Sequence, residues 1–159
     1  MKPINWKVLI ASIVLVYAIA FIGSLFTSSS VNSSWYESTK TTITPPNFIF
    51  PIVWNILFFL IALSIYISWT SAKNTSTKKS IVTLFGLNLF FNVLWSFIFF
   101  GLQNPGLAFF ELIALWISIG ALLILTYRIN HTATYFLIPY ALWVTFAGIL
   151  NWIIVFGNH

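Results

Sequence analysis

The sequence predicts an all-α integral membrane protein built as a bundle of five transmembrane helices. Hydrophobic residues make up 60% of the 159 positions, charged residues make up 6%, and the mean hydropathy is +0.97. Such a chain cannot cover a water-exposed surface with polar groups. Its apolar residues also gather into five runs of the ~20 residues needed to cross a bilayer. We therefore expect one membrane domain, residues 1–159, with no soluble domain.

The first apolar run covers about residues 6–26, with Lys2 and Lys7 at its start and the polar stretch 27–34 after it. A signal peptide would also begin with basic residues and an apolar run. This run is longer than the ~7–15 residues of a typical signal-peptide core, and four more runs follow it. We therefore expect an uncleaved first helix.

The other four runs predict helices over about 46–70, 81–102, 106–127 and 134–156. The expected connections are the segment SAKNTSTKKS, a turn at Gln103-Asn104-Pro105, and a short polar loop from Arg128 to Ala133. An odd number of spans leaves the two termini on opposite sides of the membrane.

Basic residues predict the orientation, because lysine and arginine are retained preferentially on the cytoplasmic side. With the N-terminus inside and the C-terminus outside, only Lys40 lies outside; the inner residues are Lys2, Lys7, Lys73, Lys78, Lys79 and Arg128. A bacterial plasma membrane is the expected location. This asymmetry accounts for the net charge of +5, so we expect no nucleic-acid partner.

Polar and aromatic residues repeat along one face of three of the predicted helices. Intramembrane polar groups usually face protein or a cavity, because lipid offers them no hydrogen bonds. Two readings remain open for these stripes: helix packing through amide bridges, or the lining of a ligand pocket. The stripes are Phe50, Trp54 and Phe58; Asn88, Asn92, Trp95 and Phe99; and Tyr140, Trp143, Ala147, Leu150 and Asn151.

The residues of conventional catalytic and metal sites are scarce. There is no cysteine, and His131 in a predicted loop and His159 at the end of the sequence have no companions at metal-ligand spacing. The acids are Glu37 and Glu111, far apart in sequence, which argues against hydrolysis or group transfer. We expect Glu111 to reach the interface or bond to a neighbouring helix; proton coupling is the alternative.

Three segments together resemble the translocator protein / tryptophan-rich sensory protein family, TspO/MBR. They are PPNFIFPIVW (45–54), NLFFNVLWSFIFFG (88–101) and PYALWVTFAGILN (139–151), and the pair Trp35-Tyr36 also matches. The resemblance covers essentially the whole chain. It implies a five-helix bundle with a pocket that binds tetrapyrroles, such as protoporphyrin and haem, and isoquinoline- or benzodiazepine-type ligands. It implies no obligatory cofactor; porphyrin would be a ligand or a substrate.

The same resemblance implies which residues form the pocket and its lid. Tyr36, Pro45 and Pro46 would belong to the lid, and Gly23 would face the ligand from the first helix. The chain departs from the family at Phe58, where a tyrosine is common, and at its end, IIVFGNH, which lacks the tyrosine and basic residue tied to cholesterol. The expected lining is Phe50, Trp54, Phe58, Asn88, Asn92, Trp95, Ser96, Trp143, Phe146, Ala147 and Leu150.

Three functions remain compatible with this sequence. A tetrapyrrole receptor or sensor needs only a shaped aromatic pocket and is favoured. The resemblance also implies light-dependent porphyrin breakdown, for which Trp54 and Trp143 would be the reactive neighbours. A transporter of porphyrins or other apolar small molecules is the alternative, although no internal repeat supports it. A homodimer is a further expectation, because small residues at Ala20 and Ser24, or Ala114 and Ser118, permit close helix contact.

Overall fold

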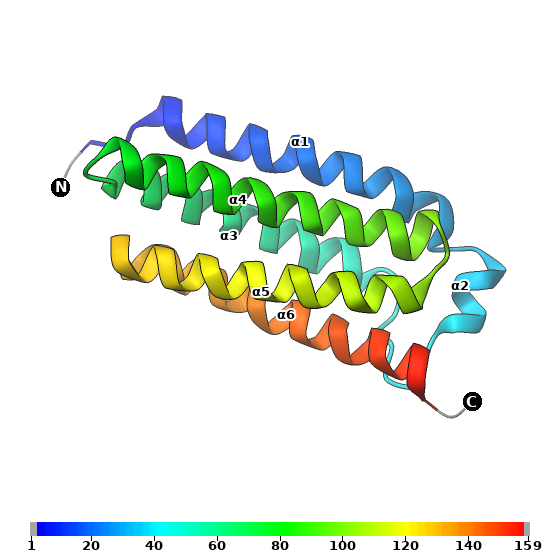
Figure 1. Ribbon diagram of the computed structural model, residues 1–159. Coiled ribbons are helices and arrows are strands. Elements are labelled where there is room, and N and C mark those ends of the chain that lie inside the picture. Colours follow the sequence, from blue (N-terminus) through cyan, green and yellow to red (C-terminus); the bar gives the residue numbers. More distant parts are fainter. Residues whose placement is uncertain (1–2, 158–159) are drawn as a thin grey trace.

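The computed structural model describes residues 3–157 as a bundle of five long helices with one short helix at its end (Figure 1). Each long helix is long and apolar enough to cross a membrane, which confirms the five-span prediction. The elements are α1 (Trp6–Ser30), the short α2 (Ser34–Thr39), α3 (Ile49–Ser71), α4 (Thr75–Ser96) with a π-helical continuation η1 (Phe97–Gly101), α5 (Pro105–Ile129) and α6 (His131–Phe156).

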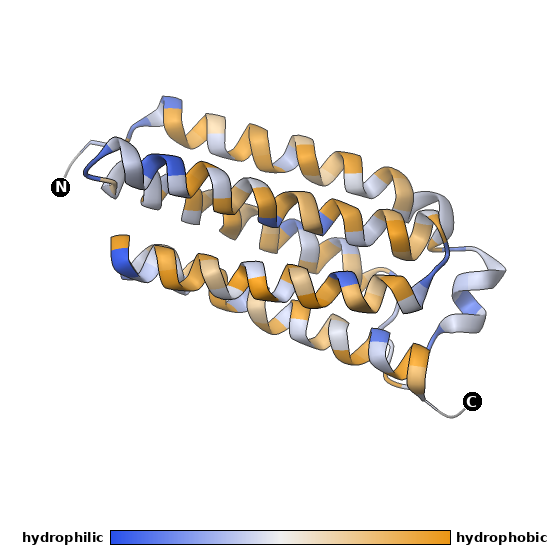
Figure 2. Ribbon diagram, in the orientation of Figure 1, coloured by the Kyte–Doolittle hydropathy of each residue, from blue (hydrophilic) through white to orange (hydrophobic). Residues whose placement is uncertain are grey.

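The five long helices form a closed ring in the order α1, α3, α6, α5, α4, since each packs against the next and α4 returns to α1. One nearly inaccessible aliphatic side chain from each helix marks the centre: Val16, Ile61, Leu89, Ile119 and Leu137. Large apolar side chains are also exposed on the outside of every long helix, and the ribbon of Figure 2 is coloured as hydrophobic along most of the length of these helices. This outer surface suits contact with lipid tails rather than water.

Asparagine caps explain where four of the long helices begin. Asn5, Asn74, Asn104 and Asn130 each accept a hydrogen bond from a backbone N–H of the first turn, at 2.8 to 3.3 Å. Hydropathy marks only the apolar part of a helix, so several predicted boundaries were wrong. The predicted loop SAKNTSTKKS is helical from Thr75 onward, and α1 continues to Ser30 rather than residue 26.

The predicted loop from Arg128 to Ala133 is also wrong, because Asn130 alone separates α5 from α6. His131 is therefore the first residue of α6, and its ring stacks on Tyr127 with centroids 4.2 Å apart. His159, the other histidine considered above, lies outside the described residues.

The helix that contains α4 widens into a π-helical turn at Phe97–Gly101. The N–H of Leu102 donates to the carbonyl of Phe97 at 2.9 Å, one residue further back than an α-helix allows. Three consecutive residues, Ile98, Phe99 and Phe100, are buried there. A regular helix would turn one of the three outward, so the widened turn brings two adjacent phenyl rings to the inside.

The two ends of the bundle differ in charge. Lys7, Lys73, Lys78, Lys79 and Arg128 belong to the helix ends and the connection at the end where α1 begins, and Lys40 belongs to the opposite end, beside α2 (Figure 1). Lys2, which was counted with the first group, lies outside the described residues.

Candidate ligand-binding site

A cavity of about 610 Å³ lies between α1, α3, α4, η1 and α6. Helix α2 and the segment that follows it border the same cavity, whereas α5 contributes no lining residue. The predicted residues that line it are Gly23, Tyr36, Phe50, Trp54, Phe58, Asn92, Trp95, Ser96, Trp143, Ala147 and Leu150. Residues from five separate elements are therefore brought together around one space.

Four predicted residues do not line the cavity. Asn88 shares the helix face of Asn92 but lies one turn deeper in the bundle, where its side chain is fully buried. Phe146 packs beside Trp143, with ring centroids 5.6 Å apart. Pro45 and Pro46 lie in the connection before α3, between two residues that do line the cavity, Thr44 and Asn47.

The sequence analysis missed the contribution of α1 apart from Gly23. Ala20, Ser24 and Thr27 also line the cavity, and their small side chains leave room beside the aromatic rings of the other helices. Small residues recur at spacings of three and four along α1, and this pattern could have indicated that α1 borders the cavity. For Ala20 and Ser24 the pattern was interpreted as a dimer contact instead. Phe99 and Asn151, which belong to the predicted stripes, also line the cavity; the other missed lining residues are Tyr17, Phe21, Ser28, Val31, Lys40, Thr44, Asn47, Pro51, Asn55, Phe100 and Ile154.

Aromatic rings form two walls of the cavity. On α3, Trp54 stacks on Phe58 with centroids 5.3 Å apart and an interplanar angle of 29°, and Phe50 meets Trp143 of α6 edge to face at 5.9 Å. On the α4 side, Trp95 stacks on Phe99 at 4.9 Å and 22°. These surfaces offer flat, apolar faces to a ligand.

Trp95 is held in place by a hydrogen bond that crosses to another helix. Its indole N–H donates to Oδ1 of Asn151 at 3.3 Å, and Nδ2 of Asn151 donates to the carbonyl of Pro105 at 2.8 Å. The chain of bonds ties α4, α6 and the start of α5 together. The indole ring is thereby fixed at the cavity wall.

A second chain of buried hydrogen bonds begins at the cavity and ends inside the bundle. Nδ2 of Asn92 donates to the Tyr140 hydroxyl at 3.4 Å, and that hydroxyl donates to Oδ1 of Asn88 at 3.2 Å. Nδ2 of Asn88 then donates to Oγ of Ser118 at 2.8 Å. Ser118, proposed above as a dimer contact together with Ala114, thus bonds within its own bundle.

Both contacts that the sequence predicted for Glu111, with the membrane interface or with a neighbouring helix, are wrong. It is 9% exposed, and neither carboxylate oxygen has a hydrogen-bond partner among the described residues. The side chain therefore neither reaches the interface nor bonds to a neighbouring helix. Proton coupling at Glu111 stays a hypothesis from the sequence.

Helix α2 closes one end of the cavity by packing on the π-helical turn. Tyr36 is 5% exposed and lies 5.4 Å from the ring of Phe100, and Trp35 meets Phe99 edge to face at 5.8 Å. The Ser30 hydroxyl also donates to the Phe100 carbonyl at 3.1 Å. Burial, and secondarily the charge of Glu37, raises the pKa of Tyr36, so its phenol stays neutral at physiological pH.

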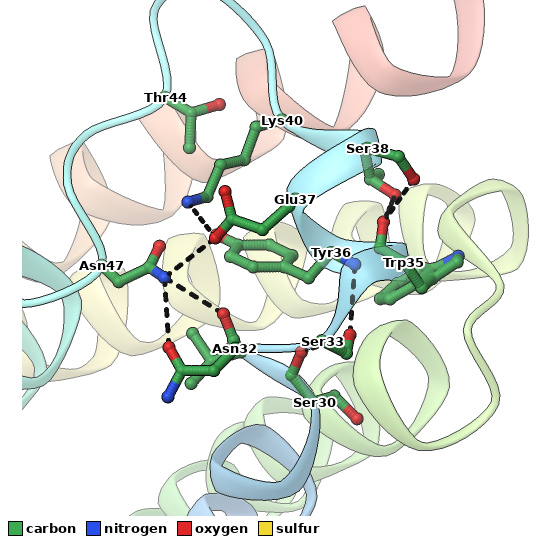
Figure 3. Close-up of polar contacts among 12 residues, drawn as sticks. Ser30, Asn32, Ser33, Trp35, Tyr36, Glu37, Ser38, Lys40, Thr44 and Asn47 are labelled. Atoms are coloured by element: carbon green, nitrogen blue, oxygen red, sulfur yellow. Dashed lines mark hydrogen bonds and ion pairs between the residues drawn. The ribbon is translucent and has the colours of Figure 1, made fainter.

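Polar side chains hold this lid to the segment that leads into α3 (Figure 3). Nζ of Lys40 donates to Oε1 of Glu37 at 2.6 Å, and Nδ2 of Asn47 donates to the same oxygen at 3.3 Å. Nδ2 of Asn47 also donates to the carbonyl of Val31 at 3.1 Å. The hydrogen bond from Lys40 is the main cause that lowers the pKa of Glu37, so this carboxyl is ionised at neutral pH.

The lining of the cavity consists mainly of aromatic and apolar side chains, with a few amides and hydroxyls. Within residues 3–157 no cluster of three His, Asp or Glu side chains could hold a metal ion. The lining residues include no histidine, cysteine or methionine. A cavity with flat apolar walls and a few fixed amides fits a planar aromatic ligand.

Known proteins of one family match this chain over nearly its full length. A family model described as "TspO/MBR family" matches residues 12–156. The tryptophan-rich protein TspO of Archaeoglobus fulgidus is 41% identical over 94% of this chain and 96% of its own length. TspO of Chlorobaculum tepidum is 35% identical over 89% of each chain, and the human translocator protein is 29% identical over 87% of this chain and 83% of its own.

Proposed function

Because the chain belongs to the TspO/MBR family, we propose that it is a membrane receptor or sensor whose cavity binds tetrapyrroles such as protoporphyrin and haem. The same site would accept isoquinoline- and benzodiazepine-type ligands, which are also aromatic. Names of relatives, among them a tryptophan-rich sensory protein of Cereibacter sphaeroides, support the receptor or sensor role.

The observation that carries the proposal is the convergence of three tryptophans from three helices on one cavity. Trp54, Trp95 and Trp143 all line the space of about 610 Å³, a volume typical of sites for small organic ligands. A porphyrin macrocycle is planar and largely apolar, so it can stack on indole faces. Asn92 and Asn151, which also line the cavity, supply amide groups that can orient the ligand.

We expect protoporphyrin to quench the tryptophan fluorescence of the purified, detergent-solubilised protein saturably in the dark. Substitution Trp143→Phe removes part of a stacking surface, and aromatic pairs contribute about 0.5–1.5 kcal/mol beyond burial. The dissociation constant should therefore rise roughly threefold to tenfold. The titration is followed at fixed protein concentration with increasing protoporphyrin.

Trp152→Phe is the matched control, because Trp152 lies on the same helix, is 52% exposed and does not line the cavity. Its titration should match the parent once the lost fluorescence is normalised. Equal weakening in both variants, or quenching that never saturates, would contradict tetrapyrrole binding in this cavity.

We also propose that light drives breakdown of the bound porphyrin, with Trp54 and Trp143 as the reactive neighbours. An excited porphyrin can exchange an electron with a stacked indole, and molecular oxygen serves as the oxidant that is consumed. Both indoles line the cavity. If the double variant Trp54→Phe, Trp143→Phe, measured at saturating porphyrin, loses porphyrin absorbance under light as fast as the parent, this role of the tryptophans is excluded.

We further propose that the chain lies in a plasma membrane with its N-terminus cytoplasmic and its C-terminus outside, as the charge difference between the two ends favours. Because the chain has no cysteine, single cysteines report sidedness directly. A membrane-impermeant maleimide should label Ser38→Cys on intact cells and should label Ser76→Cys only after permeabilisation; both serines are exposed. The opposite pattern would reverse the orientation.

A further inference from the structure

One charged side chain lines a cavity that is otherwise neutral. Among the described lining residues, the charged one is Lys40; the others are apolar, aromatic, hydroxyl or amide residues. In the charge pattern of the sequence, Lys40 is the one basic residue expected outside the membrane. Because Lys40 also lines the cavity, it can contact a bound ligand.

Lys40 lines the cavity, whereas its ion-pair partner Glu37 is the more exposed of the two side chains. Lys40 and Glu37 form an ion pair of 2.6 Å, yet the Lys40 side chain is 23% exposed and that of Glu37 is 54% exposed. Glu37 does not line the cavity. Nζ of Lys40 also lies 5.4 Å from the centre of the Tyr36 ring, which forms part of the same lining.

The ammonium group has hydrogen-bonding capacity left for a ligand. An ammonium carries three N–H donors, and the described structure records one hydrogen bond from Lys40, to Glu37. A ligand that fills the cavity and offers no acceptor would cover the remaining donors without replacing their water, which is unfavourable. A ligand carboxylate at this point would instead gain a charge-assisted hydrogen bond.

We propose that Lys40 binds the carboxylate of the ligand at the lid end of the cavity and thereby selects planar aromatic acids over their neutral esters. This inference rests on the proposed function, since it takes the aromatic walls as the binding surface for the ring. Beyond that function, the inference specifies that the ligand carries an ionised carboxylate and that Lys40 recognises this group. The ring lies against the tryptophans, and the acid points toward α2.

The test compares protoporphyrin with its dimethyl ester, which keeps the ring and removes both negative charges. The parent protein should bind the acid about tenfold more tightly than the ester, as expected for one charge-assisted hydrogen bond. In Lys40→Gln the affinity for the acid should fall until the acid and the ester bind within about twofold of each other. Both titrations use tryptophan quenching in a neutral detergent.

Lys73→Gln is the matched control, because it removes the same charge from an exposed lysine at the other end of the bundle. It should keep the tenfold preference for the acid. Glu37→Gln gives the opposite test: without the competing carboxylate, Lys40 should bind the acid more tightly, while the ester binds as in the parent. Lys40→Arg should retain the preference because it retains the charge.

The outcomes separate this inference from the proposed function. If the ester binds the parent saturably and Lys40→Gln still prefers the acid tenfold, the role of Lys40 is overturned and tetrapyrrole binding stands. If neither form binds saturably, the proposed function fails and this inference fails with it. Oleate offers a carboxylate on an acyl chain; displacement of protoporphyrin by equimolar oleate would overturn selection for a planar ring.

Discussion

Gly23→Leu is expected to weaken protoporphyrin binding at least tenfold, which corresponds to about 1.4 kcal/mol of binding free energy. Gly23 lines the cavity from α1, and a Cβ built there meets only Oγ of Ser96 and Cγ2 of Val93, both at 3.8 Å. A larger side chain therefore fits the helix contact but extends into the space that the ligand needs. Quenching titration of the two proteins measures the effect.

Gly86→Leu is the control that separates occlusion from a general effect of replacing glycine in a membrane helix. Gly86 lies on α4, is exposed, and a Cβ at this position meets nothing within 4 Å. Both replacements remove a residue with poor helix propensity, so both should leave the fold intact. Unchanged binding in Gly23→Leu would show that the ligand does not occupy the cavity beside α1.

Asn88→Leu is expected to lower the free energy of unfolding by about 1–2 kcal/mol, because it leaves buried hydrogen-bonding groups without partners. The Tyr140 hydroxyl would lose its acceptor, and the Ser118 hydroxyl would lose its donor at 2.8 Å. The side chain is fully buried, so water cannot replace the amide. Thermal unfolding in detergent, followed by circular dichroism, provides the measurement.

Ser118→Ala and the double variant Asn88→Leu, Ser118→Ala complete a double-mutant cycle for this prediction. Removing both partners of a buried hydrogen bond costs less than the sum of the single removals. The double variant should therefore be more stable than additivity predicts. Strict additivity, or a parent-like unfolding temperature in Asn88→Leu, would show that the buried chain of hydrogen bonds contributes little to stability.

The number of spans could be predicted from hydropathy, because lipid-facing and core-facing residues of these helices are alike apolar. The start of α4 could not, since this helix begins with polar residues that follow the cap at Asn74. Likewise, the spacing of Asn88 and Asn92 placed both on one helix face. This spacing does not show that Asn92 lines the cavity and Asn88 does not, because the depth of a residue in the bundle depends on how the neighbouring helices pack.

The size of the lining residues decides which parts of the cavity could be predicted from the sequence. Aromatic stripes at intervals of three and four identified the contributions of α3, α4 and α6, since large rings stand out in a sequence. Helix α1 contributes space through small side chains, which give a weak signal. Phe100 could not be placed by helical periodicity, because the π-helical turn shifts the face on which it lies.

The packing of α2 on the π-helical turn has a consequence for the kinetics of ligand exchange. Lifting α2 would separate Tyr36 from Phe100 and Trp35 from Phe99, and would expose all four rings to water. Wetting apolar surface costs roughly 25 cal/mol for each Å² exposed. A ligand that enters or leaves past this lid must cross that barrier in either direction. The rings that cover the site at equilibrium thus also set how long the ligand stays.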